Sequence, residues 1–119
     1  MGEYRLERLG RLMQEKIGAL IVERRIKDHR VDPFLSVSRV TVSRDLSYAD
    51  VYVSSFQDES AVERGVQGLQ SAAGFIQSQL NAQMHIRQTP KLRFHADESL
   101  RAGFDLVKKI EDLSGEEGR

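Results

Sequence analysis

The sequence predicts a single α+β domain in which three strands form a small mixed sheet and helices cover one of its faces. Long segments with apolar residues three and four positions apart alternate with shorter segments in which every second residue is apolar. The chain of 119 residues is long enough for one domain with its own hydrophobic core. It contains no cysteine, which excludes a disulfide scaffold and thiolate metal sites.

The first element is a helix from about Tyr4 to Lys27. Its apolar residues share one helical face, and charged residues occupy the opposite face. The apolar residues are Leu6, Leu9, Met13, Ile17, Leu20 and Ile21. Pro33 and the polar residues before it end the helix, because proline disfavours the helical conformation in the residue that precedes it.

Two strands are expected between Leu35 and Phe56. The apolar residues that alternate with polar ones are Val37, Val40 and Val42 in the first strand and Ala49, Val51 and Val53 in the second. A polar turn over residues 44–47 joins the strands into an antiparallel hairpin. The alternation slips by one residue between Val37 and Val40, which predicts a β-bulge near Arg39.

A second helical segment spans Ser60 to Met84. Its apolar stripe changes phase at Ala72-Ala73-Gly74, so we expect a kink there that divides the segment into two helices. Gly65 and Gly68 lie inside the first of these helices. Glycine in a helix costs about 1 kcal/mol relative to alanine, so alanine at either position is expected to stabilise the fold.

A third strand covers residues 91–96, and a last helix follows Asp97, which is a suitable N-cap. The inner face of that helix would consist of Leu100, Phe104, Val107, Ile110 and Leu113. Because they lie on apolar stripes, three phenylalanines are assigned to the core and not to base stacking: Phe75, Phe94 and Phe104. Residues 1–113 therefore form one domain, and residues 114–119 form a flexible acidic tail.

No catalytic or metal-site pattern is present in the sequence. The histidines at 29, 85 and 95 have no metal-ligand partner at helical or strand spacing. Neither a glycine-rich nucleotide-binding loop nor a nucleophile elbow occurs. We therefore expect no enzyme activity, no metal, no cofactor and no small-molecule substrate.

Charge alone does not decide whether the partner is a nucleic acid. The 18 Lys and Arg residues balance the 18 Asp and Glu residues, whereas a strongly basic chain would have indicated nucleic acid. The first thirty residues carry eight basic and five acidic side chains, which is also compatible with an ordinary solvated surface. The longest apolar run has four residues, so we expect no membrane span but a cytoplasmic protein that is monomeric when free.

The predicted order of elements is that of a type II KH domain, an RNA-binding fold. In such domains a G-x-x-G loop between two helices holds the backbone of about four nucleotides. A literal match occurs at Gly65-Val66-Gln67-Gly68, but it lies inside a helix, and Val66 belongs to the apolar stripe. The phase break at residues 72–74 is the better candidate for close approach of an RNA backbone.

Several motifs resemble those of the bacterial ribosome-binding factor A family. They are the runs Asp45–Ser54, Leu69–Ile76 and Arg87–Phe94, followed by Asp97, within a resemblance that covers roughly residues 3–113. The resemblance implies a type II KH-like fold in which an Ala-x-Gly kink, here at residues 72–74, replaces the G-x-x-G loop. It also implies an assembly factor that binds the small ribosomal subunit and its ribosomal RNA during late maturation, with roles in rRNA processing and cold adaptation.

The candidate RNA-binding residues are small residues at the kink and cations along the third strand, the hairpin and the first helix. They are Ala72, Ala73, Gly74, Gln77, Arg87, Lys91, Arg93, Arg39, Arg44, Arg5, Arg8 and Arg11. Gln77 departs from the family, whose members commonly have a basic residue there. Each arginine could equally be a solvated surface charge, and Arg87 could pair with Asp97 or a helix C-terminus. The alternative function is an α+β protein-interaction module without an RNA role, for which binding would hardly respond to salt.

Overall fold

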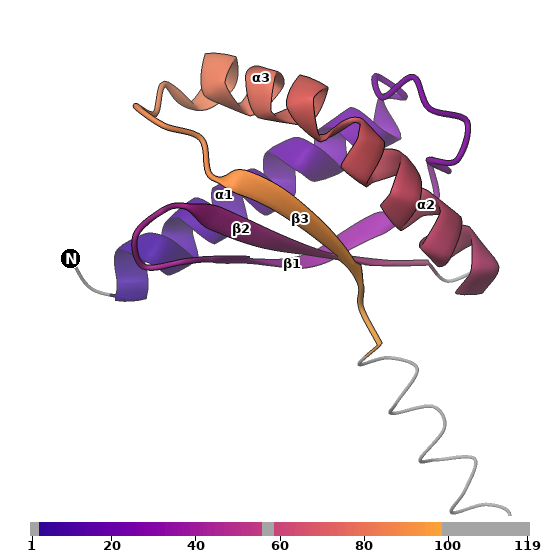
Figure 1. Cartoon of the computed structure of the whole chain (residues 1–119), viewed down its shortest axis with the longest axis horizontal. Coiled ribbons are helices and arrows are strands. Elements are labelled where there is room, and N and C mark those ends of the chain that lie inside the picture. Colours follow the sequence, from indigo (N-terminus) through magenta and orange to yellow (C-terminus); the bar gives the residue numbers. More distant parts are fainter. Residues whose placement is uncertain (1–2, 56–58, 99–119) are drawn as a thin grey trace, which may run out of the picture.

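The computed structural model describes residues 3–55 and 59–98, which form three helices and three strands (Figure 1). In chain order these are α1 (Glu3–Val22), β1 (Ser36–Val42), β2 (Tyr48–Ser54), α2 (Glu59–Ser71), α3 (Ala73–Met84) and β3 (Lys91–Ala96). The order agrees with the predicted pattern through the third strand. The expected last helix, with Phe104, and the acidic tail lie outside the described residues. None of α1, α2 and α3 combines the length and apolar character that a bilayer-spanning helix needs.

β2 is the central strand of a mixed sheet with the order β1-β2-β3. β1 and β2 form the predicted antiparallel hairpin, and β3 runs parallel to β2, which requires the crossover through α2 and α3. The pairing register shifts between Val37 and Arg39, which confirms the predicted bulge. In Figure 1, α2 and α3 run along the upper side of the sheet, and α1 crosses behind it.

One hydrophobic core joins the helices to the sheet face that they cover. Its most fully buried large side chains are Met13, Ile17, Leu20, Ile21, Val51, Val53, Leu69, Ile76 and Leu80. Phe94 is only 6% exposed, as predicted, whereas Phe75 is 42% exposed, so its assignment to the core was wrong. Ile76 and Leu80 face the core four positions apart, and Phe75 lies about 100° away from Ile76 around the helix.

α1 ends at Val22 and not at Lys27 because the chain turns into a left-handed C-cap. Arg24 has a φ of 57°, and its N–H donates to the carbonyl of Ile21, while the N–H of Arg25 donates to that of Leu20. These two hydrogen bonds form the Schellman motif, in which the left-handed residue is usually glycine. An arginine in this position leaves no signal in the sequence.

The break between α2 and α3 lies at Ala72, as the phase change predicted. Ala72 has φ −91° and ψ 7°, and its N–H lies within hydrogen-bonding distance of the carbonyls of both Gly68 and Leu69. Gly74 follows in the first turn of α3 without a positive φ, and a Cβ there would meet no atom within 4 Å. Ala72 therefore makes the break, and Gly74 leaves an open surface beside it.

Gly65 and Gly68 face the connection between α1 and β1, which corrects the expectation that alanine stabilises these positions. A Cβ on Gly65 would overlap Cδ1 of the buried Leu35. A Cβ on Gly68 would lie 2.9 Å from Cγ2 of Val31 and 3.0 Å from Cβ of Arg30. Both glycines let α2 pack closely against this connection, and that tertiary contact outweighs helix propensity.

Candidate nucleic-acid interface

Every second residue of the sheet points away from the helices, and these residues form what we call the open face. It consists of Arg39 and Thr41 on β1, Tyr48, Asp50 and Tyr52 on β2, and Lys91, Arg93 and His95 on β3. The strand register places Tyr48 opposite Lys91, Asp50 opposite Arg93, and Tyr52 opposite both Arg39 and His95. All eight side chains are exposed or half-buried. The open face therefore combines cations and aromatic rings in adjacent rows.

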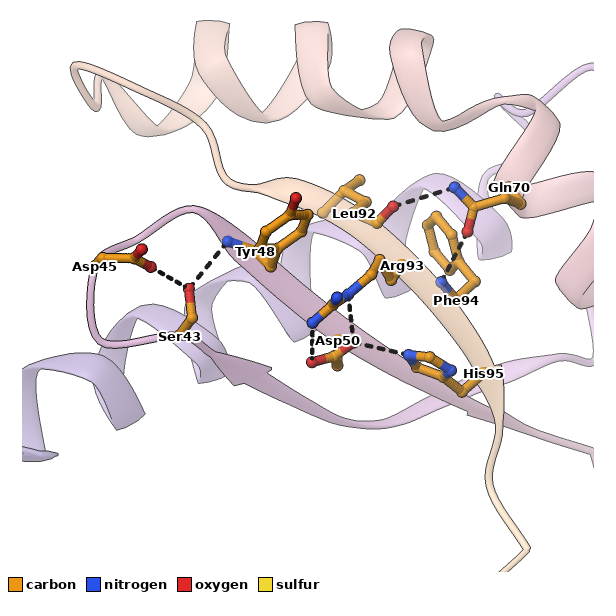
Figure 2. Close-up of polar contacts among 9 residues, drawn as sticks. All are labelled: Ser43, Asp45, Tyr48, Asp50, Gln70, Leu92, Arg93, Phe94 and His95. Atoms are coloured by element: carbon orange, nitrogen blue, oxygen red, sulfur yellow. Dashed lines mark hydrogen bonds and ion pairs between the residues drawn. The ribbon is translucent and has the colours of Figure 1, made fainter.

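Asp50 is the polar centre of the open face (Figure 2). Its carboxylate accepts hydrogen bonds from Nε of Arg93 at 2.9 Å and from Nη2 of Arg93 at 3.1 Å. Nε2 of His95 lies 2.7 Å from the same carboxylate. Partial burial raises the pKa of Asp50, but the hydrogen bonds from His95 and Arg93 outweigh it and hold the pKa below its usual value. The carboxylate is thus ionised at neutral pH and anchors both side chains.

Two arginines lie over tyrosine rings on the open face. The guanidinium carbon of Arg93 is 4.2 Å from the ring centre of Tyr48, and that of Arg39 is 4.2 Å from the ring centre of Tyr52. The rings of Tyr52 and His95 also contact each other, with centroids 5.2 Å apart and planes tilted by 30°. The negative face of an aromatic ring attracts a cation above it, so each arginine is drawn toward a ring of the sheet, and Arg93 is also held by its hydrogen bonds to Asp50.

The hairpin turn positions Arg44 beside the start of β3. Oγ of Ser43 donates to Asp45 and accepts from the N–H of Tyr48, while the N–H of Ser47 donates to Asp45. Hydrogen bonds from Ser47 and Ser43 lower the pKa of Asp45. The backbone N–H of Lys91 donates to the carbonyl of Ser47 at 2.8 Å. The turn that carries Arg44 and the first residue of β3 are therefore adjacent.

The cations Arg87 and Lys91 are exposed, and the structure gives neither an ion-pair partner among residues 3–55 and 59–98. In the part of the chain that the structure describes, Arg87 does not form the alternative pair with Asp97. Asp97 instead accepts a hydrogen bond from Oγ of Ser38. Arg87 and Lys91 can therefore bind an anionic partner without first breaking an ion pair to a carboxylate of this protein.

Arg5, Arg8 and Arg11 lie on the exposed side of α1, where they line a shallow hollow with Tyr4 and Leu12. Gly10 lets this helix pack closely against β1, since a Cβ there would lie 2.6 Å from the carbonyl oxygen of Val40. In Figure 1 the first turns of α1, the β1–β2 turn and the α3–β3 connection gather at one end of the molecule. We call this the basic end, defined by Arg5, Arg8, Arg44, Arg87 and Lys91.

The kink candidates lie apart from the open face, at the junction of α2 and α3. Ala72 and Ala73 are half-buried, whereas Gly74 and the neighbouring Phe75 are exposed. Gln77 is half-buried, and its Nε2 donates to the carbonyl of Pro90 at 3.3 Å. The predicted residues thus lie in three regions, which are the kink, the basic end and the open face. Lys91 belongs to both the basic end and the open face, and Arg11 lies further along α1.

Two further glutamines bind the outer edges of the sheet. Gln70 on α2 donates to the carbonyl of Leu92 at 3.1 Å and accepts from the N–H of Phe94 at 2.9 Å (Figure 2). Gln14 on α1 donates to the carbonyls of Val37 and Ser38 at 3.0 and 3.3 Å. These contacts connect the helix layer to β3 and β1 by hydrogen bonds as well as by the apolar core.

The sequence reasoning missed Tyr48 and Tyr52 as surface residues and the role of Asp50 between them. The signal was available, because the alternation that turns Ala49, Val51 and Val53 inward must turn these three residues outward. Within the described ranges, no three His, Asp or Glu side chains come together in a way that could hold a metal ion.

The chain is similar to known proteins along almost its whole length. The family model described as ribosome-binding factor A matches residues 5–110. A ribosome-binding factor A of Treponema denticola is 51% identical over 113 residues, which is 95% of this chain and 86% of that protein. The crystal structure of ribosome-binding factor A from Thermus thermophilus covers 82% of this chain and 98% of its own, with a TM-score of 0.66 and 26% identity.

The fold is also similar to a Thermus thermophilus ribosome-binding factor A homology model that was fitted into an electron-microscopy map of a 30S complex of that protein. The TM-score is 0.54 and the identity is 24%, over 73% of this chain and 93% of the other. At this identity the likeness concerns the fold.

Proposed function

The chain belongs to the ribosome-binding factor A family, and on that premise we propose that it binds the small ribosomal subunit as an assembly factor. The observation that carries the proposal is the family match from residue 5 to residue 110, since it covers every described element apart from the first two residues of α1. The 30S complex of the Thermus thermophilus family member supports the small subunit as the partner.

The geometry supports binding through ribosomal RNA. The basic end presents five cations from three separate segments, and RNA is a polyanion that Lys and Arg bind through its phosphates. The kink adds a surface at Gly74 where a phosphate backbone can approach the helix closely, because Gly74 is exposed and has no side chain of its own. Phosphate contacts carry no sequence information, so we expect the basic end to position the protein on the subunit.

The proposed role is one of binding and not of catalysis. It belongs to late maturation of the subunit, including rRNA processing, and to growth in the cold, when misfolded RNA resolves slowly. The protein would act in the cytoplasm, where the subunits are. These details are those that the family resemblance implies.

Sedimentation tests the proposal directly. Lysate of cold-grown cells that express the full chain is separated on a low-magnesium sucrose gradient, and the protein is expected to migrate with small subunits. Recovery only in the soluble fraction would contradict the proposal. In a second arm, the double charge reversal Arg87→Glu/Lys91→Glu is expected to release the protein from the subunits. The matched control is Arg64→Glu, at an exposed position on α2, which is expected to migrate as the unmodified protein does.

A further inference from the structure

We propose that the open face binds unpaired nucleotides of RNA by stacking their bases on two arginine–aromatic platforms. The proposal rests on the proposed function and adds the class of RNA that this surface takes, which is single-stranded. Proteins bind single strands by combining cations that follow the backbone with flat groups on which the bases stack. The open face has both kinds of group.

The first platform is Arg93 on Tyr48. Its guanidinium is held from two sides, since Asp50 accepts two hydrogen bonds from it and the Tyr48 ring lies 4.2 Å beneath it. The Arg93 side chain nevertheless remains 50% exposed. A fixed and exposed guanidinium plane is a surface on which a base can stack, and its orientation costs no further ordering when RNA binds.

The second platform is Arg39 on Tyr52, extended by His95. The guanidinium of Arg39 lies 4.2 Å from the Tyr52 ring centre, and the Tyr52 and His95 rings contact each other. His95 is in turn held by Asp50. The carboxylate of Asp50 therefore orients Arg93 of the first platform and His95 of the second, and it connects the two platforms.

The spacing and charge of the platforms fit one extended RNA strand. Tyr48 and Tyr52 are four residues apart on β2, with Asp50 between them, so the platforms are about 13 Å apart. This separation suits two bases of one strand with intervening nucleotides. Arg39, Lys91 and Arg93 outnumber the single carboxylate of Asp50 on the face, so the charge is complementary to a phosphate backbone. A duplex hides its base faces and cannot use the platforms.

Tyrosine fluorescence gives a direct readout because the chain has three tyrosines and no tryptophan. In the variant Tyr4→Phe, all tyrosine emission comes from the two platforms. Titration of this full-length variant with a single-stranded 12-nucleotide RNA is expected to quench the emission, and a duplex of the same length is expected to quench it weakly. Equal quenching by both RNAs would overturn the proposal.

Two substitutions separate stacking from charge. Arg39→Lys keeps the charge but removes the flat guanidinium, and Tyr52→Leu removes the ring beneath it. Each is expected to weaken single-strand binding by roughly 5- to 100-fold, while the salt slope changes by less than one for Arg39→Lys. The matched control is Phe34→Leu, an aromatic residue that is 63% exposed outside the open face, and it is expected to bind as the parent does. If Arg39→Lys, at an exposed position, bound as tightly as the parent, the proposal would be wrong.

The outcomes distinguish this inference from the proposed function. If the parent protein migrates with small subunits but Arg39→Lys and Tyr52→Leu bind single strands like the parent, the open face is not an RNA site and the proposed function stands. If the parent quenches selectively with single strands yet never migrates with subunits, the stacking site stands and the proposed function fails.

Discussion

Arg93 and Asp50 face each other across the β2–β3 pair and are joined by two hydrogen bonds, of 2.9 and 3.1 Å. The sequence indicated Arg93 as a cation available to phosphate, but in the structure Arg93 already forms an ion pair with the Asp50 carboxylate. Arg93 therefore differs from Arg87 and Lys91, which have no carboxylate partner in the described part of the chain. The Arg93–Asp50 pair is expected to make the stability of the fold depend on pH. The unpaired Arg87 and Lys91 are expected to make RNA binding depend on salt.

The first prediction concerns acid stability. The pKa of Asp50 is lower in the folded protein than its value of about 3.9 in an unfolded chain. Its contribution to the free energy of unfolding is therefore fully present above about pH 4 and is lost as the pH falls through the lower folded-state pKa. Asp50→Asn is expected to cost about 1 kcal/mol or less at pH 7 and to have a smaller effect at acid pH.

Urea unfolding of the parent and of Asp50→Asn at pH 7 and pH 3 checks this. Asp28 and Asp45 also have lowered pKa values, but they are present in both proteins and do not contribute to the difference. A difference in stability that is the same at both pH values would show that the pair does not act through the charge of Asp50.

The second prediction concerns salt. Arg87→Ala/Lys91→Ala is expected to reduce the slope of log binding constant against log salt by roughly 1.4 to 1.8 for RNA, because each lost phosphate contact removes about 0.7 to 0.9. Arg93→Ala is expected to lower affinity with a smaller change of slope, since Asp50 shares its charge. Filter binding between 50 and 200 mM salt, with Arg64→Ala as control, measures both. An unchanged slope in the double variant would remove Arg87 and Lys91 from the RNA surface.

The third prediction concerns the glycines of α2. Gly65→Ala and Gly68→Ala are each expected to destabilise the fold by about 1–3 kcal/mol, because the added methyl overfills a closely packed contact. Gly18→Ala and Gly74→Ala are the matched controls, since a Cβ at either site meets nothing within 4 Å. These two are expected to stabilise by about 0.4–1 kcal/mol. Thermal unfolding of all four variants measures these differences. The prediction is wrong if Gly65→Ala is as stable as Gly74→Ala.

The fourth prediction concerns the kink. Gly74→Val places a branched side chain on the open surface at the start of α3 without blocking the fold, so it is expected to melt close to the parent temperature. If the RNA backbone approaches there, it should reduce migration with small subunits in the gradient. Gly18→Val on α1 serves as the control. A Gly74→Val protein that migrates with subunits like the parent would show that RNA does not approach the kink.

The element order, the sheet and the kink could be predicted because each depends on a local pattern. Alternation in residues 36–54 gave the hairpin, and its slip located the bulge at the correct place. The expectations that were wrong failed for different reasons. The packing of Gly65 and Gly68 depends on segments distant in the sequence, whereas the end of α1 is set by a local turn. The Leu35–Gly65 contact and the Schellman cap at Arg24 leave no periodic signal, and Phe75 differs from the buried Ile76 by a single helical position. The RNA-binding residues remain predictions, although the structure shows which of them lie together.

The glutamine contacts on the two edges of the sheet have a consequence for how the protein behaves in a crowded cell. The outer strands of a three-stranded sheet present backbone N–H and C=O groups to which a strand of another molecule can add, and such addition begins aggregation. Gln14 donates hydrogen bonds to two carbonyls of β1. Gln70 donates to one carbonyl of β3 and accepts from one of its N–H groups. Side-chain amides thus stand where a foreign strand would pair, and they keep the sheet at three strands without burying its open face.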